Sequence, residues 1–206
     1  MTTRGHTEAN VKSTALLPLL IVFGGLPGTG KTTIARELMR RLAATYLRID
    51  AIEQSLREAG LAVGATGYVI ANALAAQNLM LGRIVVADCV NPVAASRNGW
   101  RETANRCAAR LIEIELICSD AAVHRRRVES RLADISGHRQ PTWDEVITRD
   151  YEPWDQEHLV LDTAMDSVDR LVDRAEAHVR DADLLQGRLE LAKDQMERKA
   201  KGEKSR

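Results

Sequence analysis

Aromatic side chains are scarce in this sequence: only 3% of its 206 residues are Phe, Trp or Tyr. Proteins that bind single-stranded nucleic acid usually stack bases on aromatic rings, so this scarcity argues against such a surface. The charges also cancel, with 29 basic and 29 acidic residues, which excludes the broad basic surface of a duplex-binding protein. We therefore do not expect nucleic acid to be a partner.

Cysteines and long apolar runs are equally sparse. The three cysteines, Cys89, Cys107 and Cys118, are odd in number and form no CxxC pair, which favours free thiols in a reducing cytoplasm. No run approaches the roughly 20 apolar residues that a membrane span requires. The apolar run at 15–23 is interrupted by Pro18 and leads into glycines, so it predicts a core strand rather than a signal peptide.

What the sequence does contain is an alternation of strand-like and helix-like stretches, with 45% hydrophobic residues. Such alternation predicts an α/β fold: a three-layer, doubly wound, five-stranded parallel sheet. The expected strands cover 19–25, 45–50, 83–90, 111–119 and 158–164. The expected helices cover 31–43, 51–60, 68–82, 97–110, 121–136 and 167–182, with a short one in 142–154 that ends near Glu152, before Pro153.

The chain length suits one domain with a substantial core. We expect this domain to span 17–183, after a disordered polar leader at 1–16. Residues 184–206 are strongly charged and predict a frayed helix followed by a solvated tail.

A glycine-rich loop follows the first expected strand and opens a helix-forming stretch. Residues 25–32 read GLPGTGKT and match the Walker A pattern GxxxxGK[ST] in full. Glycines let successive backbone N–H groups converge on one anion, and the helix adds its N-terminal N–H groups and dipole. The pattern predicts a nucleotide-phosphate site formed by Gly25, Leu26, Pro27, Gly28, Thr29, Gly30, Lys31, Thr32 and Thr33.

Two side chains of this loop have specific expected roles. The Lys31 ammonium is expected to bridge the β- and γ-phosphates, and the Thr32 hydroxyl to ligate Mg²⁺. Magnesium keeps several waters and phosphate oxygens in such sites. The expected cofactors are therefore a nucleoside triphosphate and Mg²⁺.

The stretch GLPGTGKTTIARELMRRL resembles the P-loop small-molecule kinases grouped with AAA-type ATP-binding domains. Relatives in this group include gluconate kinase, adenylylsulfate kinase, polynucleotide kinase, zeta toxins and chloramphenicol phosphotransferase. The resemblance covers about residues 18–180, through YLRIDAIEQSLR, IVVADCVNPVAASRNGW, RRRVESRLAD and YEPWDQEHLVLDTA. It implies a nucleoside-kinase-like fold, ATP rather than GTP, and a helical lid at about 124–142.

Asp50 ends the second expected strand, at the sheet edge beside the glycine-rich loop. The resemblance implies that it contacts the acceptor hydroxyl and acts as the base. A helix N-cap is the alternative role. Arg57 follows on the next helix and is expected to reach an anionic acceptor, or else to be an ordinary surface arginine. The largely apolar segment 57–74 is expected to form much of the acceptor pocket wall.

Asp88 follows four apolar residues at the end of the third expected strand, which is a Walker-B-like pattern. Such an aspartate binds Mg²⁺, directly or through water, or positions substrate, and helix capping is the alternative. Asn91 and Arg97 follow in the next loop and helix, where we expect them to contact the acceptor. Trp100 is expected in the core or in the pocket wall.

A run of basic residues marks the expected lid. Arg127 and Arg131 are four residues apart and are therefore expected on one helix face. The resemblance implies that two lid arginines at this spacing close onto the phosphates and stabilise charge in the transition state. Arg125 and Arg126 compete for this role, and a solvated charged helix is the alternative. After the last expected strand, Asp162 and Thr163 are expected to border the adenine.

These features predict a phosphotransferase that moves the γ-phosphate of MgATP to the alcohol group of a small molecule, in a monomer or homodimer. A polynucleotide-end kinase and an antibiotic- or toxin-type phosphotransferase are alternatives within the same chemistry. A regulatory ATP switch is the alternative of another class. Cys89 follows Asp88, where a dedicated ATPase has a glutamate, and this disfavours the switch.

Overall fold

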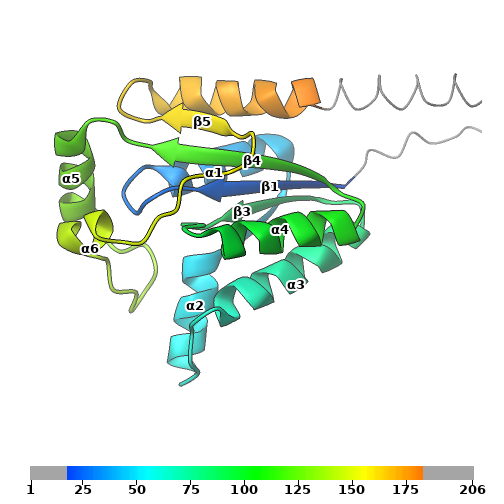
Figure 1. The fold of residues 1–206 in the computed structure, drawn as a ribbon, viewed down its shortest axis with the longest axis horizontal. Coiled ribbons are helices and arrows are strands. Elements are labelled where there is room, and N and C mark those ends of the chain that lie inside the picture. The colour runs from blue at the N-terminus through cyan, green and yellow to red at the C-terminus, as the bar shows by residue number, and fades with distance from the viewer. Residues whose placement is uncertain (1–17, 183–206) are drawn as a thin grey trace, which may run out of the picture.

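A computed structural model describes residues 18–182, in which five parallel strands form one sheet (Figure 1). The order across the sheet is β2-β3-β1-β4-β5, so the chain passes from β1 to the edge strand β2, returns to β3 beside β1, and then adds β4 and β5 on the other side. This arrangement confirms the predicted doubly wound α/β fold. The strands are β1 (Leu19–Gly24), β2 (Thr45–Arg48), β3 (Ile84–Asp88), β4 (Arg110–Ile117) and β5 (Leu159–Asp162).

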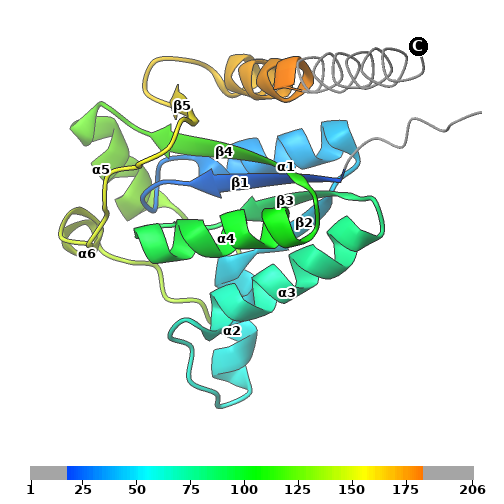
Figure 2. The ribbon, with the colours of Figure 1, turned by 45° about the vertical axis from the view of Figure 1, so that its right-hand side comes forward.

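Helices cover both faces of the sheet (Figures 1 and 2). One face carries α1 and the helix at residues 168–182, and the other carries α3 and α4. The short α5 and α6 lie beyond the carboxyl ends of the strands. The helices are α1 (Lys31–Leu42), α2 (Ile49–Glu58), α3 (Thr66–Met80), α4 (Ala94–Arg106), α5 (Ala121–Ser130) and α6 (Trp143–Ile147), besides 168–182.

The central strand β1 is buried along its whole length, which explains its continuous apolar sequence. Because side chains alternate along a strand, Ile21 and Phe23 pack with α1 and the helix at 168–182, while Leu20 and Val22 pack toward α3 and α4. Trp100 of α4 is fully buried in the second cluster. It belongs to the core and not to a pocket wall.

Two boundaries differ from the sequence prediction in ways that affect the site. Strand β2 ends at Arg48, so Asp50 lies in the first turn of α2. Helix α5 ends at Ser130, and Arg131 has extended backbone with φ −71° and ψ 137°, so the expected helix to residue 136 is wrong. The short helix α6 also ends earlier than expected, at Ile147.

The expected leader at 1–16 and tail at 184–206 lie outside the described residues. Within residues 18–182, none of the helices is both long and apolar enough to cross a membrane.

Candidate active site

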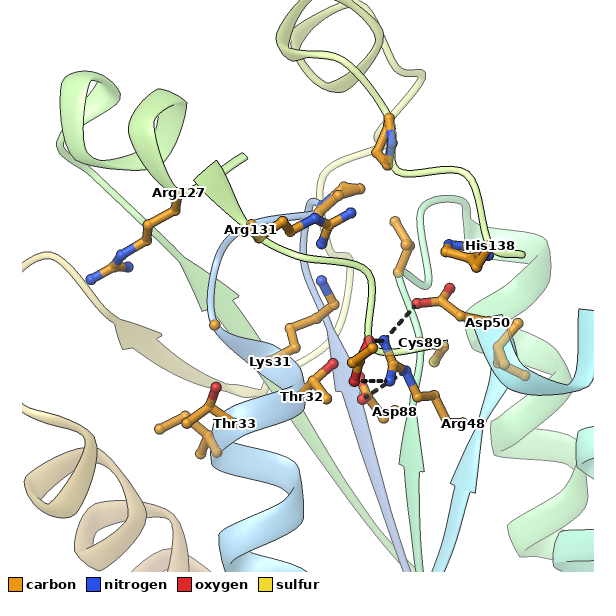
Figure 3. A pocket seen from close by; sticks show the side chains of 18 of the residues that line it. Lys31, Thr32, Thr33, Arg48, Asp50, Asp88, Cys89, Arg127, Arg131 and His138 are labelled. Atoms are coloured by element: carbon orange, nitrogen blue, oxygen red, sulfur yellow. Dashed lines mark hydrogen bonds and ion pairs between the residues drawn. The ribbon is translucent and has the colours of Figure 1, made fainter. Parts of the chain in front are cut away.

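An open pocket of about 840 Å³ lies at the carboxyl edge of the sheet (Figure 3). Ligands of doubly wound folds bind at this edge, where the chain switches from one side of the sheet to the other. The glycine-rich loop after β1, the ends of β2 and β3, helix α2 and the segment after α5 all contribute to its wall. The pocket therefore joins the predicted phosphate loop to the predicted acceptor and lid residues.

The glycine-rich loop turns its second half toward the pocket. Gly28 and Gly30 have φ values of 86° and 91°, which side-chain-bearing residues rarely adopt. The loop residues that line the pocket are Pro27, Gly28, Gly30, Lys31, Thr32 and Thr33. The other predicted residues support the loop from behind: Thr29 donates its hydroxyl to Leu26 O at 2.9 Å, and Gly25 N donates to Val90 O at 3.0 Å.

Lys31 is buried although it is a cation, and its Nζ donates to Leu26 O at 2.8 Å. Burial lowers the pKa of Lys31 to about 8, an effect that the nearby carboxylates of Asp88 and Asp50 partly oppose. Its ammonium points into the pocket (Figure 3). The geometry thus places a weakly solvated positive charge where phosphate would bind to the loop.

Asp88 ends β3 and is 3% exposed. The Tyr46 hydroxyl donates to its Oδ2 at 2.7 Å, and Arg48 Nε lies 3.9 Å from the same oxygen. Burial and the neighbouring Asp88 charge raise the pKa of Tyr46 well above its usual range, so this phenol remains a donor.

The donor set fits Mg²⁺, because the Asp88 carboxylate and the Thr32 hydroxyl line the same pocket as Lys31. In the part of the chain that the structure describes, there is no group of three His, Cys, Asp or Glu side chains suited to a metal. A magnesium ion here would therefore depend on water and phosphate oxygens for most of its ligands, as it does in other nucleotide sites.

Asp50 lines the pocket from the first turn of α2. The N-cap of this helix is Arg48, so the alternative role of Asp50 as an N-cap is wrong. Its carboxylate lies 3.5 Å from the Arg48 guanidinium and is 37% exposed, so it remains accessible to a substrate. Arg57 also lines the pocket, where it pairs with Glu53 at 3.2 Å.

Arg48 is the main site residue that the sequence analysis missed. Its side chain is 9% exposed and lies near three carboxylates, those of Asp50, Asp88 and Asp134. Strand alternation could have placed Tyr46 and Arg48 on one face of β2. The missing information was the pairing of β2 with β3, which sets Arg48 opposite Asp88.

The two predicted lid arginines point to different places, contrary to the expectation of one shared helix face. Arg127 donates to the Thr163 hydroxyl at 2.7 Å and to Thr163 O at 3.0 Å. Arg131 lies beyond the end of α5 and projects toward Lys31, while Arg127 points away from it (Figure 3). Burial lowers the pKa of Arg131. The structure thus places Arg131 over the phosphate loop and Arg127 beside the strand end of β5.

Asn91 and Arg97 do not line the pocket. Arg97 is fully buried and donates to Asn91 O and Glu152 O, both at 3.3 Å, and to Pro153 O at 3.0 Å. Its guanidinium also lies 5.2 Å from the ring centre of Trp154. Arg97 thus joins the loop after β3 to the loop before β5. This placement does not support the acceptor contacts that were expected of Asn91 and Arg97.

Of the two residues expected to border the adenine, Asp162 and Thr163, only Thr163 lines the pocket. Asp162 accepts from Ser119 N at 3.1 Å and from Ala164 N at 3.0 Å. The Asp162 carboxylate therefore connects the loop after β4 to the loop after β5 by hydrogen bonds.

The part of the pocket where the sequence predicted an acceptor is more charged than the sequence suggested. Of the expected apolar wall at 57–74, only Arg57 and Tyr68 line the pocket. The remaining side chains come from α2 and from the segment around α6: Asp50, Glu53, His138, Arg139, Glu145 and Arg149. An acceptor bound here would contact polar groups over much of its surface.

Comparison with known proteins gives the family. Residues 20–149 match the family model described as AAA domain. Among curated proteins, none matches the sequence. Similar solved structures include a candidate kinase from Chloroflexus aurantiacus, with a TM-score of 0.64 and 24% identity over 81% of this chain and 98% of that one.

Two further structures share the fold. A gluconokinase from Sinorhizobium meliloti has a TM-score of 0.60 and 20% identity, covering 84% of this chain and 98% of that one. The APS kinase CysC of Mycobacterium tuberculosis, solved with AMPPNP and APS, has a TM-score of 0.57 and 17% identity, covering 79% and 98%. With the family match over more than half of its length, this chain belongs to the AAA domain family and has the fold of the P-loop kinases.

Proposed function

We propose that this protein is a kinase that transfers the γ-phosphoryl group of MgATP to a hydroxyl of a small molecule. The observation that carries the proposal is one pocket that contains Lys31, Asp88 and Asp50 together. A phosphate loop alone would serve any nucleotide-binding protein. An accessible carboxylate on the opposite wall supplies a place for a hydroxyl acceptor and its proton.

In the proposed reaction the acceptor hydroxyl lies between Asp50 and the γ-phosphorus. Its oxygen forms a bond to phosphorus while the bond to the β–γ bridging oxygen breaks, and ADP leaves with that electron pair. The hydroxyl proton passes to the Asp50 carboxylate late in the step. Arg48, 3.5 Å from Asp50, orients this carboxylate.

Positive groups stabilise the charge of the transferring phosphoryl group. Lys31 binds the β- and γ-phosphates from the loop, and Arg131 approaches from the lid. Mg²⁺ held by Thr32 and Asp88 would supply further charge neutralisation. The Arg127 and Thr163 pair lies on the far side of the pocket, where we infer that it borders the nucleoside.

The acceptor lies on the α2 side of the pocket. Its wall combines carboxylates, arginines, His138 and the ring of Tyr68. Such a wall suits a compact, multiply hydroxylated molecule, because each hydroxyl finds a donor or an acceptor. The pocket is open, so limiting hydrolysis would require the segment after α5 to move over the bound acceptor.

The test is ADP release from MgATP in the presence of pooled sugars, nucleosides, amino acids, hydroxylated antibiotics and 5′-hydroxyl oligonucleotides. One acceptor that raises turnover at least tenfold would support the proposal and identify the acceptor class. Asp50→Asn should lower that turnover about 10²- to 10⁴-fold while MgATP affinity changes less than twofold. Tight MgATP binding with a flat panel and no effect of Asp50→Asn would instead favour a regulatory switch.

A further inference from the structure

The segment after α5 is tied to the body of the domain by one carboxylate, that of Asp134. It accepts from both terminal nitrogens of Arg48, at 2.6 Å and 3.0 Å, and from Arg36 at 2.9 Å. Arg36 belongs to α1 and Arg48 to β2, so the two arginines converge on Asp134 from separate elements. All three residues line the pocket.

This contact is stronger than an ordinary surface ion pair. The two bonds from Arg48 are bidentate, Arg36 adds a third, and the Arg48 side chain is only 9% exposed, although the Asp134 side chain is 40% exposed to solvent. The hydrogen bond from Arg48 is the main cause that lowers the pKa of Asp134 to about 2. The carboxylate is therefore ionised throughout the physiological pH range, and its attachment is independent of pH there.

Arg131 depends on this attachment for its position. It follows Ser130 directly at the end of α5 and has extended backbone, so helical hydrogen bonding does not continue through it. Its Nε is buried without a hydrogen-bond partner among the described side chains and backbone. Three residues later, Asp134 is the point at which the segment is bonded to the domain, which leaves only a short span of chain to set the direction of Arg131.

We propose that Asp134 is a positioning residue that, through Arg48 and Arg36, holds Arg131 over the phosphate loop. The inference rests on the proposed phosphoryl transfer, since Arg131 has a catalytic task only there. Asp134 itself does not touch the reacting atoms, because both of its oxygens are occupied by arginines. Asp50, by contrast, has a single arginine at 3.5 Å and a free carboxylate edge.

The experiment uses the full chain and needs no acceptor. Aluminium fluoride with MgADP imitates the charge of the transferring phosphoryl group, so the ratio of its affinity to that of MgADP alone measures transition-state stabilisation. Asp134→Asn should lower this ratio at least tenfold and change MgADP affinity less than twofold. The matched control is Glu129→Gln, which removes a carboxylate from an exposed ion pair with Arg125 at 2.8 Å on α5, outside the pocket.

A double substitution tests whether Asp134 acts through Arg131. Arg131→Ala should lower the same ratio, and adding Asp134→Asn to it should produce little further loss, because the two changes remove one interaction. Additive losses would overturn the proposal, as would an unchanged or raised ratio in Asp134→Asn alone.

Hydrogen exchange separates failure of this inference from failure of the proposed function. Amides at 131–142 should exchange at least tenfold faster in Asp134→Asn than in the wild type or in Glu129→Gln, with no nucleotide added. Unchanged exchange would overturn the attachment whatever the protein binds. If these amides exchange faster in Asp134→Asn but the wild-type protein binds no MgADP, the attachment through Asp134 is supported and the proposed kinase function is rejected.

Discussion

At the scale of single residues, the site is governed by charges that are buried but compensated. Lys31 faces Asp88 and Asp50, and Arg48 faces the same two carboxylates together with Asp134. Removing a charge from such a cluster leaves its partners desolvated and unpaired, which costs more than the pair itself contributes. Substitutions here therefore need controls for stability.

The lowered pKa of Lys31 predicts a pH-dependent nucleotide affinity. With a pKa of about 8, Lys31 loses its charge between pH 7 and 9, and phosphate binding requires the ammonium. MgATP affinity should therefore fall about tenfold over this range, with proton uptake on binding near pH 8. Isothermal titration in buffers of different ionisation enthalpy measures both quantities.

Lys31→Arg is the matched control for this prediction, because a guanidinium stays charged throughout the range. Its absolute affinity should be lower and its pH dependence largely lost. A wild-type affinity that is flat from pH 7 to 9 would contradict the lowered pKa. The effect of pH on folding has the opposite sign. Between about pH 8 and 10.4, Lys31 is more protonated in the unfolded chain than in the folded protein, so the free energy of unfolding rises with pH.

Arg97 should matter for stability and not for catalysis. Arg97→Ala removes donors to three backbone carbonyls and should lower the free energy of unfolding by about 3–5 kcal/mol, as for other broken buried charged contacts. Urea denaturation measures this loss. Arg106→Ala, an exposed change on the same helix, should cost less than about 0.5 kcal/mol. Similar losses for the two variants would show that the contacts of Arg97 contribute little.

At the scale of elements, α5 and the phosphate loop are packed as one unit. A Cβ on Gly28 would lie 2.5 Å from Cγ2 of Val128, and the ring nitrogen Nε2 of His124 lies 2.8 Å from Pro27 O. The rings of His124 and of Trp143, at the start of α6, also pack in a T-shaped arrangement with their centres 5.2 Å apart. Helix α5 is therefore in direct contact with the phosphate loop.

Gly28→Ala should weaken MgATP binding at least tenfold, for two separable reasons. One is the φ of 86°, which costs a side-chain-bearing residue roughly 1–3 kcal/mol, and the other is the contact with Val128. Adding Val128→Ala should restore only the steric part of the loss. Complete restoration, measured by titration calorimetry, would contradict a backbone cause, and no restoration would contradict the packing of α5 on the loop.

At the scale of the whole molecule, nucleotide should stabilise the fold, because its site joins both sides of the sheet. MgATP at 100 times its Kd should add about 2.7 kcal/mol, which raises Tm by roughly 5–10 °C in a domain of this size. Differential scanning calorimetry measures the shift. Lys31→Ala should remove it, and a shift that persists in that variant would place the nucleotide elsewhere.

Much of this molecule could be predicted from local patterns. The Walker A motif at 25–32 indicated a phosphate loop. The continuous apolar strands and the helices that alternate with them indicated a doubly wound sheet, and the structure confirms that fold. Asp88 was placed correctly because a buried strand ends in a carboxylate. Arg131 was expected on a helix, but its backbone is extended and its chain is bonded to another element.

The fold class and the phosphate loop follow from local patterns of residues, because strand burial and glycine conformation are properties that a short stretch of chain expresses. Which charged residues meet depends on the packing of distant segments. Arg48 faces Asp88 through strand pairing, Asp134 reaches Arg48 across 86 positions of chain, and Arg97 turns into the core. Ion pairs between distant segments leave no periodicity in a sequence, since each partner alone resembles an ordinary surface charge.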